Sequence, residues 1–236
     1  MNNSILAKIE SIFDFKYPKL YYQLANDSML SIGKTGENWY TDTYPKLKDN
    51  PPLLLYSDDF ELLSPELVYE TLEDMTEPDS CLNIKLDYHF IPFGQSGAGD
   101  YYCFFLNEST VEDIPITIVY HDENRAEYLA KNLQDFIFIE ILQYMTDINE
   151  YKATNDIEFK ANVIHLLKTH LRYLSKSQQN CLNELINQAI VEYEVVFASG
   201  SIEQHRGFLT EQECQQKIVK LAPYKKLEKA FCYSDD

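Results

Sequence analysis

The sequence predicts an α+β protein in which an antiparallel sheet packs against helices, followed by an α-helical C-terminal extension. Strand-like and helix-like segments alternate up to about residue 150, and mostly helical spacing follows. The polar stretch TDINEYKATND comes directly after the apolar FIFIEIL and marks the change. We therefore expect an α+β domain at residues 1–149 and a helical extension at residues 150–236. The 236 residues, 45% of them hydrophobic, suffice for a substantial core.

The first half of the expected domain begins with helices at residues 4–13 and 14–27, the second starting near Pro18. Residues 37–48 are expected to form a loop, and PPLLLY at residues 51–56 a strand. The next helix is the clearest element, because Ser64 can cap it and Pro65 suits its first turn. Its apolar positions fall on one face at helical spacing: Leu67, Val68, Thr71, Leu72 and Met75.

Three extended segments follow, at residues 81–93, 100–108 and 114–122, and predict an antiparallel sheet. Residues 126–145 return to helical spacing and are expected to cover that sheet. Beyond residue 150 we expect a helix from about residue 157 to 174 and another from 177 to 197. Thr210 and Glu213 form a capping box that opens a last helix.

The charge is strongly acidic and unevenly distributed. The chain has 38 acidic and 20 basic residues, a net charge of −18. Residues 1–149 hold 26 acids and 9 bases (net −17), whereas residues 150–236 hold 12 acids and 11 bases (net −1). Such a field disfavours nucleic acid and anionic membrane as partners and favours a basic protein, although solubility alone could also explain it.

The acidic residues concentrate around the helix that follows Ser64. Residues 58–87 contain ten acids and one base. On the helix they occupy the side opposite the apolar face, where a solvated surface is the simplest explanation and a docking surface for a basic partner is the functional one. The candidate interface consists of Asp58, Asp59, Glu61, Glu66, Glu70, Glu73, Asp74 and Glu77.

The stretch IPFGQSGAGDYYCFF contains three of the seven glycines. A nucleophile elbow needs a glycine two residues after the serine, but Ala98 occupies that position relative to Ser96. A phosphate loop needs a lysine directly after its last glycine, but Asp100 follows Gly99. The glycines also lead into a strand and not into a helix, unlike a dinucleotide-binding motif. We therefore expect a tight turn, with positive φ at Gly97 and Gly99 and with Asp100 bonding nearby amides.

Other reactive residues form no recognisable site. The five cysteines are scattered and predict neither disulfides nor a zinc site, and Cys103 has no base near it in the sequence. His165 and His170 are five residues apart and are expected at the surface or its boundary. His121 with Asp122 is typical of a strand-end turn. We expect no catalytic residue, metal or cofactor, and the lack of a signal peptide or a long apolar run favours a cytoplasmic location.

The glycine stretch, with the elements around it, resembles the SUKH superfamily, the Smi/Knr-like fold. The family pattern is Ile-Pro-hydrophobic-Gly, a Gly-containing turn, then Gly-Asp and an aromatic strand. It is matched by Ile91, Pro92, Phe93, Gly94, Gly97, Gly99, Asp100, Tyr101 and Tyr102, and the closing helix by Asp135 and Phe136. The resemblance covers about residues 1–145. It implies a non-enzymatic α+β protein, and most bacterial relatives are immunity proteins that bind and neutralise a cognate toxin from polymorphic, contact-dependent or type VI systems.

Three hypotheses follow. The first is a cytoplasmic immunity protein for interbacterial competition that acts by stoichiometric binding to a basic toxin, for example a nuclease. The second is a regulatory scaffold like the eukaryotic relatives, which regulate cell-wall synthesis. The third is a hydrolase that uses Ser96 or a Cys–His pair. The gene neighbourhood would separate the first two, because a toxin-domain gene immediately upstream favours immunity.

Overall fold

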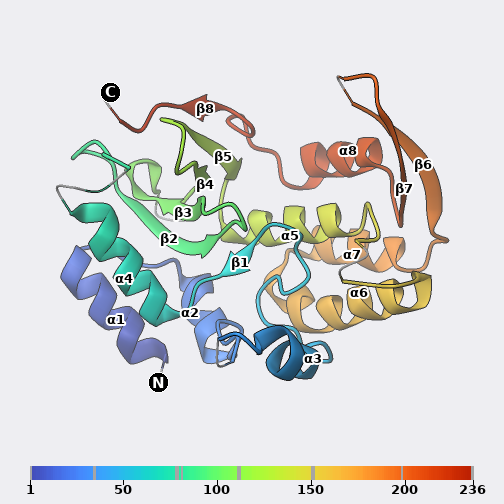
Figure 1. The fold of residues 1–236 in the computed structure, drawn as a ribbon, viewed down its shortest axis with the longest axis horizontal. Coiled ribbons are helices and arrows are strands. Elements are labelled where there is room, and N and C mark those ends of the chain that lie inside the picture. Colours follow the sequence, from blue (N-terminus) through green and yellow to red (C-terminus); the bar gives the residue numbers. More distant parts are fainter. Residues whose placement is uncertain are drawn as a thin grey trace.

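The computed structural model describes residues 2–33, 36–77, 80, 82–110, 113–149, 152–197 and 199–234. A six-stranded antiparallel sheet forms its centre, with strands in the order β1-β2-β3-β4-β5-β8 (Figure 1). The strands are β1 (Glu61–Leu62), β2 (Phe90–Gln95), β3 (Tyr101–Phe105), β4 (Ile116–Val119), β5 (Ala126–Ala130) and β8 (Ala230–Phe231). The expected α+β class and antiparallel sheet are confirmed.

Helices of the N-terminal half pack beside this sheet. They are α1 (Asn2–Phe13), α2 (Lys19–Asn26) and α4 (Pro65–Thr76), with α4 against β2 and α1 (Figure 1). The Ser64 hydroxyl accepts a bond from the Leu67 N–H at 3.3 Å, which confirms the predicted cap. Val68, Leu72 and Met75 are buried, whereas Leu67 is exposed.

Both faces of the sheet are covered, which explains why its strands are continuously apolar. On one face Phe93, Phe104 and Phe136 pack together, with the ring centroids of Phe93 and Phe104 4.6 Å apart. The opposite face buries Phe90 and Phe105 in a second cluster, with centroids 4.8 Å apart. Alternate residues of β3 therefore enter different clusters.

Helix α5 (Leu133–Tyr144) lies between the sheet and the C-terminal elements (Figure 1). Most of its residues are buried, because it has neighbours on several sides. The residues before it were predicted to be helical, and this prediction is wrong. Ala126–Ala130 form β5, whose side chains alternate between buried and partly buried. The alternation typical of a strand extends over only five residues here, and in the sequence it merges with the apolar helix that follows.

The C-terminal half contains α6 (Asp156–His170), α7 (Lys176–Leu185) and α8 (Glu211–Leu221), with both capping partners present at Thr210 and Glu213 as predicted. Its apolar residues share one buried cluster with the N-terminal half, for example Leu182 with Phe136. Gln178 reaches across and donates to Asp135 Oδ1 at 2.8 Å. The division between residues 149 and 150 stays a prediction about chain organisation, and residue 150 lies outside the described residues.

Three further differences from the sequence predictions occur. The helix expected to reach residue 197 ends at Leu185, and a hairpin of β6 (Val191–Val196) and β7 (Ile202–Gly207) follows it. The segment VEYEVVF favours a strand because it is rich in β-branched and aromatic residues, and the Ser-Gly-Ser sequence after it favours a turn. Residues 51–56 form buried turns and not a strand. Residues 39–47 contain a π-helix (Trp39–Thr43) and α3 (Tyr44–Leu47); two short 3-10 helices lie at Leu106–Glu108 and Leu171–Tyr173.

His170 is also placed differently, since it is fully buried. Its Nε2 accepts a bond from the Leu54 N–H at 3.0 Å, and burial lowers its pKa to about 4. The neutral imidazole thus serves a backbone amide of the buried turn, which a prediction from helical spacing alone could not place.

Candidate functional site

The turn between β2 and β3 is closed by its own backbone. The Ser96 N–H donates to the Asp100 carbonyl at 2.8 Å, and the Gly99 N–H donates to the Ser96 carbonyl at 3.1 Å. Gly99 has φ +101°, where a side chain would strain the backbone, so the expected positive φ is confirmed there. It is wrong for Gly97, which has no positive φ and where nothing lies within 4 Å of an added Cβ.

Polar side chains of this turn are used within it. The Ser96 hydroxyl donates to Asp100 Oδ2 at 3.1 Å and accepts from the Ala98 and Asp100 N–H groups at 3.2 and 3.0 Å. Asp100 Oδ1 lies 3.1 Å from the His121 backbone nitrogen and 2.8 Å from its Nδ1. The turn is thereby tied to the end of β4, and Ser96 is a buried turn residue.

Asp100 and His121 affect each other's protonation. Burial raises the pKa of Asp100, but hydrogen bonds from His121 and Ser96 outweigh it and hold that pKa below the ordinary value. The hydrogen bond to Asp100 raises the pKa of His121 above the ordinary value. Asp122 brings a third ligand atom to within 4.8 Å, yet both Asp100 oxygens already accept bonds from Ser96 and His121. The geometry is that of a turn reinforced by a hydrogen bond between a carboxylate and an imidazole.

Other positions of the glycine stretch shape the sheet. A Cβ at Gly94 would lie 2.1 Å from a ring carbon of Phe60, so only glycine lets that ring lie against β2. The pairing of β2 with β3 shifts register between Pro92 and Gly94. Tyr101 is partly buried against the second cluster. Cys103 is fully buried in that cluster, and burial raises the pKa of its thiol well above the ordinary value. Cys81 lies outside the described residues.

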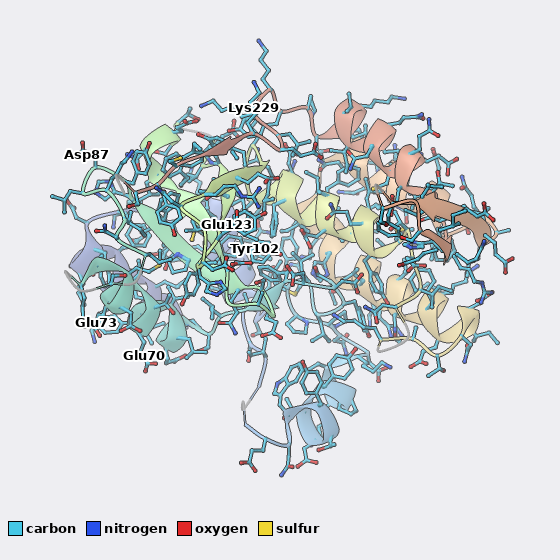
Figure 2. The ribbon with its side chains drawn as sticks, turned by 45° about the horizontal axis from the view of Figure 1, so that its top comes forward. Glu70, Glu73, Asp87, Tyr102, Glu123 and Lys229 are labelled. Atoms are coloured by element: carbon cyan, nitrogen blue, oxygen red, sulfur yellow. The ribbon has the colours of Figure 1, made fainter. Side chains whose placement is uncertain are left out.

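The acidic residues of α4 lie on its exposed side. Figure 2 shows Glu70 and Glu73 pointing away from the protein. Among the residues that the structure describes, no basic nitrogen forms an ion pair with the candidates on this helix; the Glu73 carboxylate instead accepts from the Tyr69 hydroxyl at 2.6 Å. The exposed set, called the α4 acidic face below, is Glu66, Glu70, Glu73, Asp74 and Glu77.

The other three acidic candidates have partners within the protein. Asp58 accepts from Asn149 Nδ2 at 2.8 Å, Asp59 from the Tyr102 hydroxyl at 3.1 Å, and Glu61 from Gln95 Nε2 at 3.2 Å. In Figure 2 Tyr102 lies near the centre of the molecule, away from Glu70 and Glu73. The structure therefore separates the predicted interface into the α4 acidic face and a group around β1.

Two charged residues that the sequence analysis missed belong to the group around β1. Glu140 of α5 accepts from the Ser57 hydroxyl at 2.5 Å, and burial raises its pKa to about 7. Lys152 donates to the Ser57 carbonyl, and burial lowers its pKa, although attraction by Asp58 and other acids opposes this. The sequence analysis passed over Glu140 because it lies within the apolar run FIFIEIL. A single acid in the middle of an apolar helix is a signal that could have identified it.

An apolar hollow lies on the buried side of α4, near its C-terminal end. Its volume is about 500 Å³, and Leu72 and Met75 of α4 line it together with Phe13, Tyr88 and Phe90. Glu77 reaches the same hollow. An apolar depression with charged residues at its margin is the usual composition of a protein-binding surface.

The sheet, its covering helices and the Gly-Asp turn define the SUKH class of α+β proteins. The chain belongs to the SMI1/KNR4 family (SUKH-1), whose model matches residues 2–138. No curated protein and no solved structure matches the chain. The superfamily is one of immunity proteins and supports a protein-binding role. None of the described helices is long and apolar enough to cross a membrane.

Proposed function

We propose that the protein is a cytoplasmic immunity protein that binds and neutralises a cognate, basic bacterial toxin without catalysis. Its membership of the SUKH-1 family supports the immunity role. The observation that carries the docking part of the proposal is the α4 acidic face: four exposed carboxylates on one side of a 12-residue helix and a fifth, Glu77, at its C-cap, where the helix ends beside an apolar hollow.

Folding gives no reason for this arrangement. Like charges four residues apart, such as Glu66 with Glu70 and Glu70 with Asp74, cost a few tenths of a kcal/mol each. Asp74 and Glu77 also lie near the C-terminal end of α4, where the helix dipole disfavours negative charge. In contact with a basic protein the same charges raise the rate of association, which matters when the target is lethal.

The alternative of a hydrolase is weakened by the turn geometry. Ser96 is buried and bonded within its turn, and Cys103 is enclosed in the second cluster. We expect Cys103→Ala and His121→Ala to leave protection of toxin-expressing cells intact, and Ser96→Ala to change it only as far as it weakens folding. Loss of protection in a variant that folds and still binds the toxin would favour an enzyme.

The direct test is co-purification of the full chain with the product of the adjacent gene, followed by a rescue assay in cells that express that product. We expect a stoichiometric complex and restored growth. A control variant replaces the exposed Lys220 of α8 by Glu and is expected to bind and to rescue growth as the wild type does. If the adjacent product neither binds nor is toxic, the immunity proposal is wrong and the regulatory scaffold becomes the better hypothesis.

A further inference from the structure

The hairpin of β6 and β7 forms a separate two-stranded sheet at the edge of the molecule (Figure 1). Its two strands pair from Val191 with Gly207 to Val196 with Ile202. An isolated hairpin is only marginally stable in water, so its base needs other contacts.

These contacts are present at the base. The Tyr193 hydroxyl donates to the Thr146 carbonyl at 2.9 Å, and Arg206 donates to both Asp156 oxygens at 2.7 and 2.9 Å. A Cβ at Gly207 would lie 2.1 Å from the Thr146 carbonyl oxygen, so the two backbones touch there. The hairpin is held in place at one end and reaches into solvent at the other.

The hydrogen-bond register shows which backbone groups point outward. Phe197 N–H donates to the Ser201 carbonyl at 2.9 Å, so this pair is a hydrogen-bonded one. In an antiparallel pair such positions alternate with positions whose N–H and C=O groups point away from the partner strand. On β7 the Arg206 N–H points outward and donates to Asp147 Oδ1 at 2.9 Å, as this alternation requires.

On β6 the outward groups belong to Glu192, Glu194 and Val196. All three residues are exposed, and no described residue bonds their outward N–H or C=O groups. Strand β6 thus presents an open sheet edge, to which an extended peptide can add as a further strand.

Side chains beside this edge indicate what kind of strand fits. Val196 is 67% exposed and Ile202 opposite it 58%, which makes the tip apolar. Glu192 and Glu194 lie on the same outer side; Arg206 is shared between Asp156 and Glu192, and Glu194 accepts a bond from the neutral Gln204 amide at 2.8 Å. The edge is therefore apolar at the tip and acidic toward the base.

A second copy of the chain fits this edge poorly. A two-fold pairing of β6 centred on Glu194 would place Glu194 directly opposite its own copy, and like charges opposite each other destabilise a sheet. The net charge of −18 on each chain adds repulsion. A strand from a different protein that carries basic side chains would instead be attracted by the negative charge of this edge.

We infer that β6 is a second docking surface, which takes an extended segment of a basic protein partner as an added antiparallel strand. An apolar side chain of that segment lies beside Val196, and Lys or Arg side chains lie beside Glu194 and Glu192. This inference depends on the proposed function in one respect, which is that the partner is a basic protein.

The probe is the peptide acetyl-Val-Thr-Lys-Thr-Lys-Thr-amide, titrated into the full chain labelled with nitrogen-15. We expect shifted amide resonances and slower hydrogen exchange at Glu192, Glu194 and Val196. The control peptide carries N-methyl groups on its two lysine amides, which removes hydrogen bonds toward β6 and keeps the charge. It is expected to bind about tenfold more weakly.

A matched pair of variants tests the protein side. Glu194→Pro removes an outward N–H that the hairpin does not use and is expected to weaken the peptide about tenfold, whereas Glu194→Gln keeps that N–H and loses only charge. Equal binding of the methylated peptide, or resonance shifts on α4 in place of β6, would overturn the inference. So would a dimer of the free chain, detected by sedimentation, that Glu194→Pro abolishes.

The two proposals fail in different ways. If Glu194→Pro still protects cells while reversal of the α4 charges abolishes protection, the toxin does not use β6 and the immunity proposal stands. If the peptide binds β6 but the adjacent gene product is harmless, the edge is a docking surface and the immunity proposal fails.

Discussion

The Gly-Asp turn and the α4 acidic face both contain charged residues, but the fold uses them in opposite ways. In the turn, each Asp100 oxygen has a partner from Ser96 or His121. On α4 the carboxylates are exposed, as Figure 2 shows for Glu70 and Glu73, and the described residues offer them no ion pair. The group around β1 is intermediate, because Asp58, Asp59 and Glu61 are exposed yet bonded. Charge that folding leaves unused is the charge available for a partner.

The largest effect is expected from the glycine that lies against Phe60. Gly94→Val would place side-chain atoms where the Phe60 ring lies. We expect this clash to lower the free energy of unfolding by about 3 kcal/mol. Urea denaturation followed by circular dichroism measures it. Gly97→Val is the control for added side-chain bulk, because nothing lies within 4 Å of the Cβ there and, as at Gly94, φ is not positive. Equal losses in both variants would mean that the Phe60 contact does not decide the effect at Gly94.

A second effect is expected from Glu140. Its pKa is about 7 in the folded protein and about 4.5 in the unfolded chain, so the folded state holds the proton more tightly between these values. Stability from this residue is therefore present below about pH 4.5 and is lost as the pH rises through about 7.

Glu140→Gln removes that loss. At pH 8 we expect the variant to be about 2 kcal/mol more stable than the wild type, with little difference at pH 4.5. Urea midpoints across this range measure it, and they are compared as differences because the shifted pKa values of Asp58 and Lys152 affect both proteins. A constant difference at all pH values would mean that Glu140 ionises normally.

The third prediction uses the two glycines that the sequence could not distinguish. Gly99→Ala is expected to lower the free energy of unfolding by about 1–2 kcal/mol, because φ there is +101°. Gly97→Ala is expected to change it by less than about 0.5 kcal/mol, because no positive φ and no neighbour opposes a methyl group. Thermal denaturation of both variants compares them directly, and a larger loss at Gly97 would contradict the turn geometry.

Much of the N-terminal half was predictable because its signals are local. Ser64 and Pro65 specify the start of α4, and the aromatic runs around Gly99 specify two strands. The buried turn at Leu54 was not predictable, since its amide is bonded by His170, a residue 116 positions later. Strand β8 likewise exists only because Ala230 and Phe231 return to pair with β5.

The candidate interface was predictable in part for the same reason. Helical spacing alone places Glu66, Glu70 and Glu73 on one side of α4, and the structure has them exposed there. Spacing could not show that Asp59 meets the Tyr102 hydroxyl or that Glu140 and Lys152 join that group, because those contacts depend on packing. Their role in binding a partner stays a prediction.

The smallest effect on folding, and the largest on binding, is expected from reversing the α4 acidic face. Replacing Glu66, Glu70 and Asp74 by Lys touches no described ion pair, so the free energy of unfolding should change by no more than about 0.5 kcal/mol. The association rate with a basic toxin should fall and should depend less on salt, because long-range attraction is what salt screens. Stopped-flow association at several ionic strengths measures both quantities.

The group around β1 supplies the matched comparison. Reversing Asp58, Asp59 and Glu61 removes the same amount of negative charge but breaks bonds to Asn149, Tyr102 and Gln95, so we expect a loss of stability as well as a slower association. If both triple variants slow association equally, net charge alone steers the toxin. If only the α4 variant does so, the helix is the docking surface. Unchanged rates and salt slopes in the α4 variant would place the toxin elsewhere, and the open edge of β6 is then the first surface to test.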